Sequence, residues 1–347
     1  MKILVFEFAT LNKLEDSSIT AEGSAMLQAL LEDLDEFKTY NLIPNGSETI
    51  KSFKSNSISI TGDLKDWIRS NINQFDACIP IAPEENNLLY DLTRIIEEQD
   101  VEVIGSNSNA VKKTTNKCDT YNALKNKVSI IKTEKVYFED SIKKFKEQID
   151  KFNTGLHKQS QVLKPADGVS CSGVNVINSF NEFIAAKDQI KMHTQLPYFI
   201  LQDYISGVNV SVSLLSNGET AIPLSLNLQD VSLKSGEIKY HGGKVPFEHR
   251  LSDVAMETAK NAVESIDGLI GYVGVDMIID DEKNNVYVVE INSRVTTPYV
   301  ALRKLLNFNL GEAIINSVHG ELPTEIELNG QVHFYKEGKT LRVSVLK

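Results

Sequence analysis

Two runs rich in β-branched residues near the C-terminus constrain the fold of this chain more than any other stretch. They cover residues 273–280 and 286–294, and the polar stretch DEKNN at residues 281–285 separates them. This pattern predicts an antiparallel hairpin. If the turn centres on Lys283, Asp276 lies directly opposite Glu290. Asn292 then points to the same face as Glu290, because side chains alternate between the two faces of a strand.

The predicted hairpin brings two carboxylates and an amide oxygen together. Like charges opposed across a strand pair cost about a few tenths of a kcal/mol, and a hard divalent cation would remove that cost. Such oxygen ligands suit Mg²⁺, as one or two ions, with Mn²⁺ as an alternative. Arg294 would hold an anion beside the metal, and metal, anion and arginine together suggest a nucleoside triphosphate. The alternative is a solvated hairpin with scattered charges.

Length and charge narrow the class of protein. The chain has 347 residues and a formal net charge of −11, so two or three domains are expected. An acidic chain argues against nucleic-acid binding, which needs clustered Lys and Arg.

Three features bear on the location of the protein. Cys78, Cys118 and Cys171 form no CxxC pair, which favours a reducing cytoplasm. The early charge in the N-terminal segment argues against a signal peptide, and no apolar run suggests a membrane span.

The N-terminal region, residues 1–105, alternates strand and helix patterns. Strands are expected at 2–8, 77–81 and 101–105, with apolar helical faces at 26–34 and 88–96. This alternation predicts a parallel α/β sheet. Ligands of such a sheet bind at the carboxyl ends of its strands, here near residues 7–10 and 80–84.

Two further regions follow. Residues 106–195 are expected to hold helices around 118–124 and 142–152 and a strand near 162–163. Residues 196–347 indicate an antiparallel sheet with a helix at 254–266 and a terminal hairpin turning at 337–339. The predicted fold class is therefore α/β, and α+β in part.

A loop of small residues lies at 163–174 (LKPADGVSCSGV). Its glycines let the backbone approach a ligand closely, and its serines add donors of little bulk: Gly168, Gly173, Ser170 and Ser172. Backbone N–H groups there could cradle phosphate oxygens, with Lys164 as a point charge. The spacing resembles GxxxxG, but VN follows where a P-loop has Lys-Ser/Thr, so it is not a P-loop. A plain flexible hairpin is the alternative.

A bend between two strands lies within residues 199–212 (FILQDYISGVNVSV). The first strand ends at Gln202, the bend spans residues 206–207, and the second strand starts at Asn209. Backbone donors and acceptors are exposed there beside an apolar wall, which suits an adenine ring. An ordinary strand–turn–strand is the alternative.

The order of these three features resembles that of the ATP-grasp superfamily, and the resemblance covers nearly the whole chain. Residues 83–87, 104–107 and 116–117 are similar to the domain that precedes the ATP-grasp domain and to the family's first lysine. The resemblance implies a pre-ATP-grasp domain at 1–105, a small lid subdomain at 106–195 and a large subdomain at 196–347.

The resemblance also implies roles for individual residues. ATP phosphates would be bound by Lys117, Lys164 and the glycine–serine loop. Adenine would contact Gln202, Asp203, Tyr204 and Ile205, and Asn209 occupies the ribose position. The metal ligands would be Asp276, Glu290 and Asn292. Arg294 would steady the transferred phosphoryl group or the acyl phosphate.

Within that superfamily, the chain is most similar to the archaeal tyramine–glutamate ligases of methanofuran biosynthesis. This similarity rests on residues 6–8, 20–27, 225–229, 240–246 and 291–297. It implies an amide bond between the γ-carboxylate of glutamate and tyramine, made through an acyl phosphate with release of ADP and phosphate. The implied partners are ATP, glutamate and an amine, and homodimers are common among similar proteins.

Substrate contacts are expected from residues near the cleft: Glu7, Glu22, Tyr240, Gly243, Thr296 and Thr297. His241 is a candidate base. Gly274 stands where some family members have a phosphate-binding Arg, so Lys244 is a candidate for that positive charge. Asn116 and Asn209 also replace acidic residues that are common in the family.

Other functions stay open. A ligase for another amino acid and amine, or for dipeptides, would use the same motifs. A non-catalytic nucleotide sensor need not keep the full set of Asp276, Glu290, Asn292 and Arg294, which argues against it. A small-molecule kinase would stop at a phosphate ester.

Overall fold

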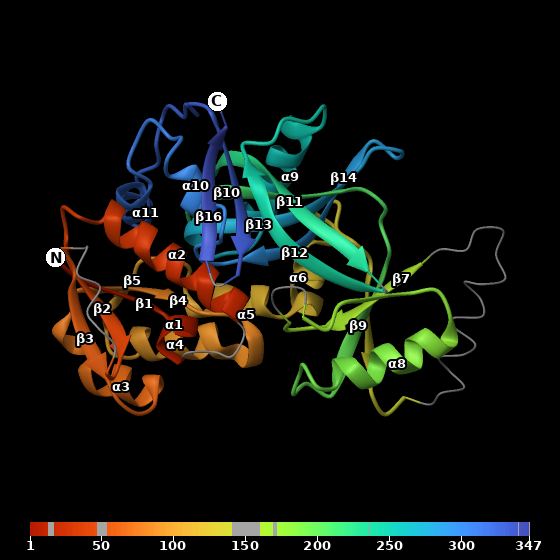
Figure 1. Cartoon of the computed structure of the whole chain (residues 1–347), viewed down its shortest axis with the longest axis horizontal. Helices are drawn as coiled ribbons and strands as arrows, with labels where there is room; N and C mark the ends of the chain where they lie inside the picture. Colours follow the sequence, from red (N-terminus) through yellow and green to blue (C-terminus); the bar gives the residue numbers. More distant parts are fainter. Residues whose placement is uncertain are drawn as a thin grey trace.

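The chain builds two sheets, joined by helices (Figure 1). The computed structural model describes residues 1–12, 17–46, 54–140, 160–168, 172–234, 236–338 and 340–346. The helix expected over 142–152, the loop residue Ser170 and the turn residue Lys339 lie outside the described residues.

The first sheet is parallel, with strand order β3-β2-β1-β4-β5. Its strands are β1 (Lys2–Glu7), β2 (Lys38–Pro44), β3 (Asn56–Ile60), β4 (Ala77–Ile81) and β5 (Glu102–Val103). Its helices are α1 (Phe8–Asn12), α2 (Ser17–Asp33), α3 (Leu64–Asn71) and α4 (Leu88–Glu97), with 3₁₀ turns at Ile72–Gln74 and Glu85–Asn87. The predicted parallel α/β region is confirmed, although β2, β3 and α3 were not anticipated.

The second sheet follows the order β14-β13-β10-β11-β12-β8-β7-β9-β6, and β15 joins β12 to β16. Its strands are β6 (Thr133–Tyr137), β7 (Gln161–Pro165), β8 (Asn175–Ile177), β9 (Tyr198–Asp203), β10 (Val208–Asn217), β11 (Ala221–Lys234), β12 (Glu237–Val245), β13 (Ile270–Asp280), β14 (Asn285–Asn292), β15 (Gln331–Glu337) and β16 (Thr340–Leu346). The accompanying helices are α5 (Ser108–Thr115), α6 (Lys117–Leu124), α8 (Phe180–Ile190), α9 (Ser252–Glu264), α10 (Tyr299–Leu302) and α11 (Leu310–Val318).

A small unit of β6, β9 and β7, covered by α8, lies at the far end of the molecule from the first sheet (Figure 1). Its own apolar core includes Leu163, Phe183 and Phe199. The division of the chain at residue 195 stays a prediction. Strand β9 follows that point but pairs with β6 and β7.

The hairpin of β13 and β14 is confirmed, with one difference in its register. The turn covers residues 281–284 and Asp280 pairs with Asn285, so it does not centre on Lys283. A β-bulge follows, because Met277 pairs with Val288 whereas Asp276 pairs with Glu290. The extra residue on β14 restores the predicted pairing of the two carboxylates.

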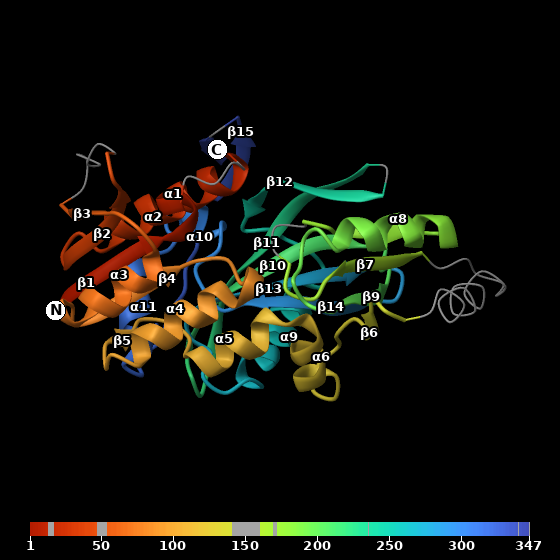
Figure 2. The same ribbon diagram turned by 90° about the horizontal axis from the view of Figure 1, so that it is seen from below.

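Apolar packing leaves one face of the second sheet free for the site. Helix α9 covers one face of β10, β11, β13 and β14, and Figure 2 shows α5, α6 and α9 on the same side of these strands. A separate core joins β1, β4 and α2 to α10, α11 and β15, so the first sheet packs against the C-terminal elements. Among the described helices, none is both long and apolar enough to span a bilayer.

Candidate active site

A cavity of about 510 Å³ lies where the first sheet, the small unit and the β13–β14 hairpin meet. The carboxyl ends of β1 and β4 reach it through Glu7 and Ile81, as expected for a parallel α/β sheet. Most of the predicted site residues line it: Glu7, Glu22, Lys117, Lys164, Gly168, Ser172, Gln202, Asp203, Tyr204, Ile205, Asn209, Tyr240, Asp276, Glu290, Asn292, Arg294, Thr296 and Thr297. Gly173, His241, Gly243 and Lys244 are not among the lining residues.

The carboxylates of Asp276 and Glu290 face each other in the cavity wall. Gln229 Nε2 donates to Asp276 Oδ1 at 3.0 Å, and Asn292 Nδ2 lies 3.4 Å from Asp276 Oδ2. Burial and the neighbouring Glu290 raise the pKa of Asp276 to about 8. Burial also opposes ionisation of Glu290, but Lys117 and Lys164 outweigh it and lower the pKa of that carboxyl. Glu290 is therefore the charged member of the pair, whereas ionisation of Asp276 is disfavoured.

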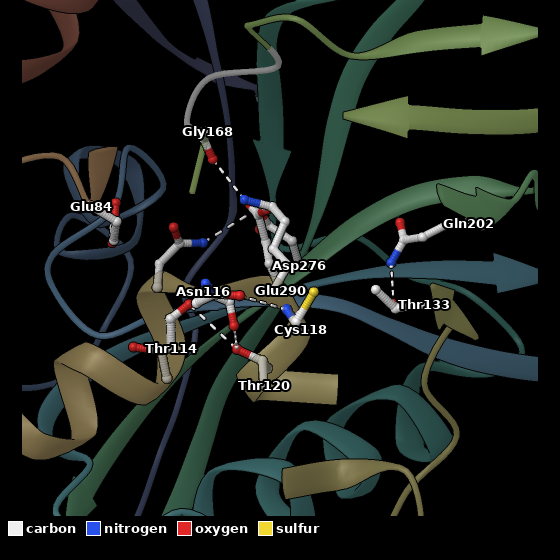
Figure 3. Close-up of polar contacts among 12 residues, drawn as sticks. Glu84, Thr114, Asn116, Cys118, Thr120, Thr133, Gly168, Gln202, Asp276 and Glu290 are labelled. Carbon is white, nitrogen blue, oxygen red and sulfur yellow. Dashed lines mark hydrogen bonds and ion pairs between the residues drawn. The ribbon is translucent and has the colours of Figure 1, made fainter. Parts of the chain in front are cut away.

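Two lysines reach this pair from different elements. Lys117 begins α6, whose N-terminus is capped by the Asn116 side chain. Its Nζ donates to the Gly168 carbonyl at 2.6 Å and lies 3.1 Å from Glu290 Oε2 (Figure 3). Lys164, on β7, is 6% exposed and acts on the same carboxylate. Both lysines that are predicted to bind ATP phosphates therefore lie beside the carboxylates.

The donor set suits Mg²⁺ bound together with phosphate. The described residues contain no group of three His, Cys, Asp or Glu side chains that could hold a metal ion by themselves. Mg²⁺ commonly takes one or two carboxylates and completes its shell with substrate phosphates and water. Opposed carboxylates and the raised pKa of Asp276 fit a cation at this position. Asn292 would present its amide oxygen after rotation of the amide group.

Arg294 is held by a carboxylate that was not singled out as a site residue. Its Nη2 donates to Glu84 Oε2 at 2.8 Å, and its Nη1 donates to the Val295 carbonyl at 3.2 Å. Burial alone would lower the pKa of the Arg294 guanidinium, but the Glu84 carboxylate more than offsets it. Glu84 comes from the loop after β4, so the pair ties the first sheet to the end of β14. Its strand-end position was the signal that could have identified it.

The hinge between β9 and β10 forms the other end of the cavity. The Tyr204 N–H donates to the Ser160 carbonyl, whereas the Ile205 N–H has no acceptor among the described residues. Gln202 donates to Thr133 Oγ1 at 2.8 Å, away from the Asp276–Glu290 pair (Figure 3). Apolar side chains flank the hinge: Ile131, Val162, Met277, Ile278 and Val289. A flat aromatic base fits this combination of an apolar slot and a backbone donor.

The two candidate substrate glutamates are already engaged with protein groups. Glu7 accepts the N–H groups of Ala9 and Thr10, which caps α1, and burial raises its pKa despite these bonds. Glu22 accepts from Thr297 Oγ1 at 2.6 Å and pairs with Lys336 Nζ at 2.5 Å. Both carboxylates line the cavity, but a substrate ammonium would have to share them with these partners.

Three of the predicted residues lie outside the cavity for reasons of strand geometry. A bulge between Asp230 and Val231 makes His241 the extra residue of β12, where it is exposed and hydrogen-bonds Ser232. Lys244 pairs with Leu228 and points to the face opposite Gln229, so it cannot supply a cavity charge. A Cβ at Gly243 would lie 2.2 Å from the Leu228 carbonyl oxygen, so this glycine serves strand packing.

Two further glycines have structural explanations. Gly274 lies under Thr296, since a Cβ there would be 2.8 Å from Thr296 Cγ2. This contact explains why an arginine is absent from that position. Gly173 has a φ of 69° and packs on Pro165, so it shapes the loop without lining the cavity.

Comparison with known proteins agrees with this geometry. Residues 114–298 match the model of an ATP-grasp domain family, and residues 49–111 match a pre-ATP-grasp domain. The chain therefore belongs to the ATP-grasp family. The predicted fold and the predicted class of ADP-forming ligase are confirmed.

Within this family, the chain is similar to tyramine–L-glutamate ligases. It is 33% identical over 350 residues to that of Methanocaldococcus fervens, covering 99% of both chains. It is 33% identical over 330 residues to that of Methanocaldococcus jannaschii, covering 92% of this chain and 90% of that one. A crystal structure of an ATP-grasp superfamily protein from Archaeoglobus fulgidus has a TM-score of 0.72 and 26% identity, with 100% of each chain covered.

Proposed function

We propose that this protein is an ATP-dependent ligase that joins the γ-carboxylate of L-glutamate to the amine of tyramine. The observation that carries the proposal is the meeting of Asp276, Glu290, two lysines and Arg294 in one cavity. The nearly full-length similarity to tyramine–L-glutamate ligases supports the choice of substrates.

The first step forms an acyl phosphate. An oxygen of the glutamate γ-carboxylate attacks the γ-phosphorus of ATP, and ADP leaves. Such a transfer needs positioning and charge neutralisation more than a protein nucleophile. Lys117 and Lys164 would bind the phosphates, and the Ile205 N–H would bind adenine. Mg²⁺ held by Asp276, Glu290 and Asn292 would neutralise phosphate charge.

The second step forms the amide. The neutral amine nitrogen attacks the acyl carbon, a tetrahedral oxyanion forms, phosphate leaves, and a water or a carboxylate near the nitrogen takes its proton. Arg294 would stabilise the developing charge, because Glu84 fixes its guanidinium at the cavity wall. His241 does not line the cavity and is hydrogen-bonded to Ser232, so we do not assign it as the base.

The test measures ADP release with Mg-ATP and glutamate, with and without tyramine, together with the product mass. Tyramine-dependent release and a mass of γ-glutamyltyramine are expected. Hydroxylamine in place of the amine should trap the acyl phosphate as a hydroxamate. Glu290→Ala, which removes a carboxylate of the metal site, should abolish both products.

Other outcomes would redirect the proposal. ADP release with a different amine or acid would keep the ligase chemistry and reject this substrate pair. ATP binding without ADP formation from any acid–amine pair would indicate a nucleotide sensor.

A further inference from the structure

The hairpin of β11 and β12 presents an unbroken apolar surface to the cavity. Val231 pairs with Tyr240, and Leu233 pairs with Ile238. All four side chains line the cavity. Residues paired across an antiparallel ladder share a face, so they form one continuous patch, here called the β11–β12 patch.

The β11–β12 patch begins beside the reaction centre. Gln229, Val231 and Leu233 alternate along β11, which has no extra residue here because the bulge lies on β12. Gln229 donates to Asp276 at 3.0 Å. One strand repeat of two residues covers about 7 Å, so Val231 lies one repeat and Leu233 two repeats along β11 from Gln229.

One residue of the patch is held by a cation, and another is half exposed. Lys336 Nζ lies 4.9 Å from the centre of the Tyr240 ring and is itself paired with Glu22. This contact covers one face of the ring and fixes its orientation. Leu233 is 48% exposed, which is high for a leucine on a cavity wall.

We infer that the β11–β12 patch binds the aromatic ring of an arylethylamine substrate. This inference rests on the proposed ligase function and adds the location of the ring. A two-carbon linker would let the ring lie against Val231 and Tyr240 while the amine nitrogen reaches the acyl phosphate near Asp276. The face of the ring would cover apolar surface of the exposed Leu233, which is the residue of the patch that gains most from being removed from water.

The test makes the patch more polar. Val231→Thr keeps the branched shape and replaces one methyl with a hydroxyl, and Leu233→Ser shortens a residue that is already half exposed. The double variant should lower kcat/KM for tyramine about 10-fold to 100-fold. One methylene in a closed apolar pocket contributes about 10-fold to 200-fold, and the half-exposed Leu233 should contribute less. Its kcat/KM for ethylamine and its hydroxamate formation with hydroxylamine should stay unchanged. Val254→Thr, on the outer side of α9 and 46% exposed, is the matched control.

The outcomes separate the inference from the proposed function. If the wild-type protein formed hydroxamate but did not use tyramine, tyramine would be ruled out as the amine substrate. If the wild-type protein used tyramine and the double variant had the same kcat/KM and normal thermal stability, the inference would be overturned. Equal losses of kcat/KM for tyramine and for ethylamine would also overturn the inference. The patch would then contribute to the fold and would not bind the aromatic ring.

Discussion

Neutralising the two carboxylates of the predicted metal site should change the free energy of unfolding in opposite directions. Asp276→Asn removes the charge that Glu290 repels, and the new amide can still accept from Gln229. Glu290→Gln removes the counter-ion of Lys117, which is 8% exposed. In metal-free buffer, Asp276→Asn should therefore stabilise the protein and Glu290→Gln should destabilise it.

The size of the first effect follows from the pKa of Asp276, which rises from 3.8 to about 8. At about 1.4 kcal/mol per tenfold change, this difference sets an upper limit of about 6 kcal/mol. The carboxylate borders a cavity that water can enter, so we expect about 1–3 kcal/mol. Removing one partner of a buried ion pair costs about 3–5 kcal/mol. Glu290 is 24% exposed, so Glu290→Gln should cost roughly 1–3 kcal/mol.

The sign of the pH dependence follows from linkage. A carboxyl with a raised folded-state pKa binds a proton on folding, so its stability cost appears as pH rises above 4 and is complete above about pH 8. The gain from Asp276→Asn should thus be small near pH 4 and largest near pH 8.5. Urea unfolding in EDTA at several pH values measures it.

Mg²⁺ provides the second arm of this experiment. It should stabilise the wild-type protein through preferential binding to the folded state, and stabilise both variants much less. If Asp276→Asn destabilised the protein in EDTA at pH 8.5 as much as Glu290→Gln does, the assigned repulsion between the carboxylates would be wrong.

Three further predictions concern the surroundings of this pair. Lys164→Met should raise the Kd for ATP about 10-fold or more, measured by calorimetry, because a phosphate charge partner is lost. Glu84→Gln should lower kcat about 10-fold with little change in KM for ATP, since Arg294 loses the anion that fixes it. Gly207→Ala should cost about 1–3 kcal/mol of stability, because a Cβ there would lie 2.2 Å from the Ile279 carbonyl oxygen.

Each of these predictions has a nearby control. Lys191→Met, Glu98→Gln and Ser206→Ala alter exposed residues and should leave ATP binding, kcat and stability unchanged. An unchanged ATP affinity in Lys164→Met would move the phosphate site elsewhere. Wild-type kcat in Glu84→Gln would remove Glu84 from the positioning of Arg294. A fully stable Gly207→Ala protein would mean that β10 can shift at the hinge.

The sequence predicted contacts within single ladders well. The opposition of Asp276 and Glu290 needed only the period of two residues in a strand and a polar turn. The turn was assumed to centre on Lys283, but Asp280 pairs with Asn285, so its centre lies between Glu282 and Lys283. A bulge at Val289 restores the expected pairing of Asp276 with Glu290. Bulges carry little sequence signal, so the correct pairing depended on a feature that the pattern could not reveal.

The same kind of bulge explains the failures on β12. In a regular strand Lys244 would share the cavity face of Tyr240, because the two lie four residues apart, whereas His241 would face away. The extra residue at His241 decides which side chains face inward. Tyr240 lines the cavity and Lys244 does not.

Contacts between distant segments were beyond any local pattern, and they determine how the charges of the site balance. Glu84 meets Arg294 across 210 residues, and Lys336 reaches Glu22 from the C-terminal hairpin. Each pair neutralises a charge that would be costly to bury alone. Lys117 and Glu290 do the same in the centre of the cavity, whereas Asp276 is hydrogen-bonded by the amide of Gln229, and burial and Glu290 oppose its ionisation. This opposition is the strongest electrostatic argument for placing the cation at Asp276.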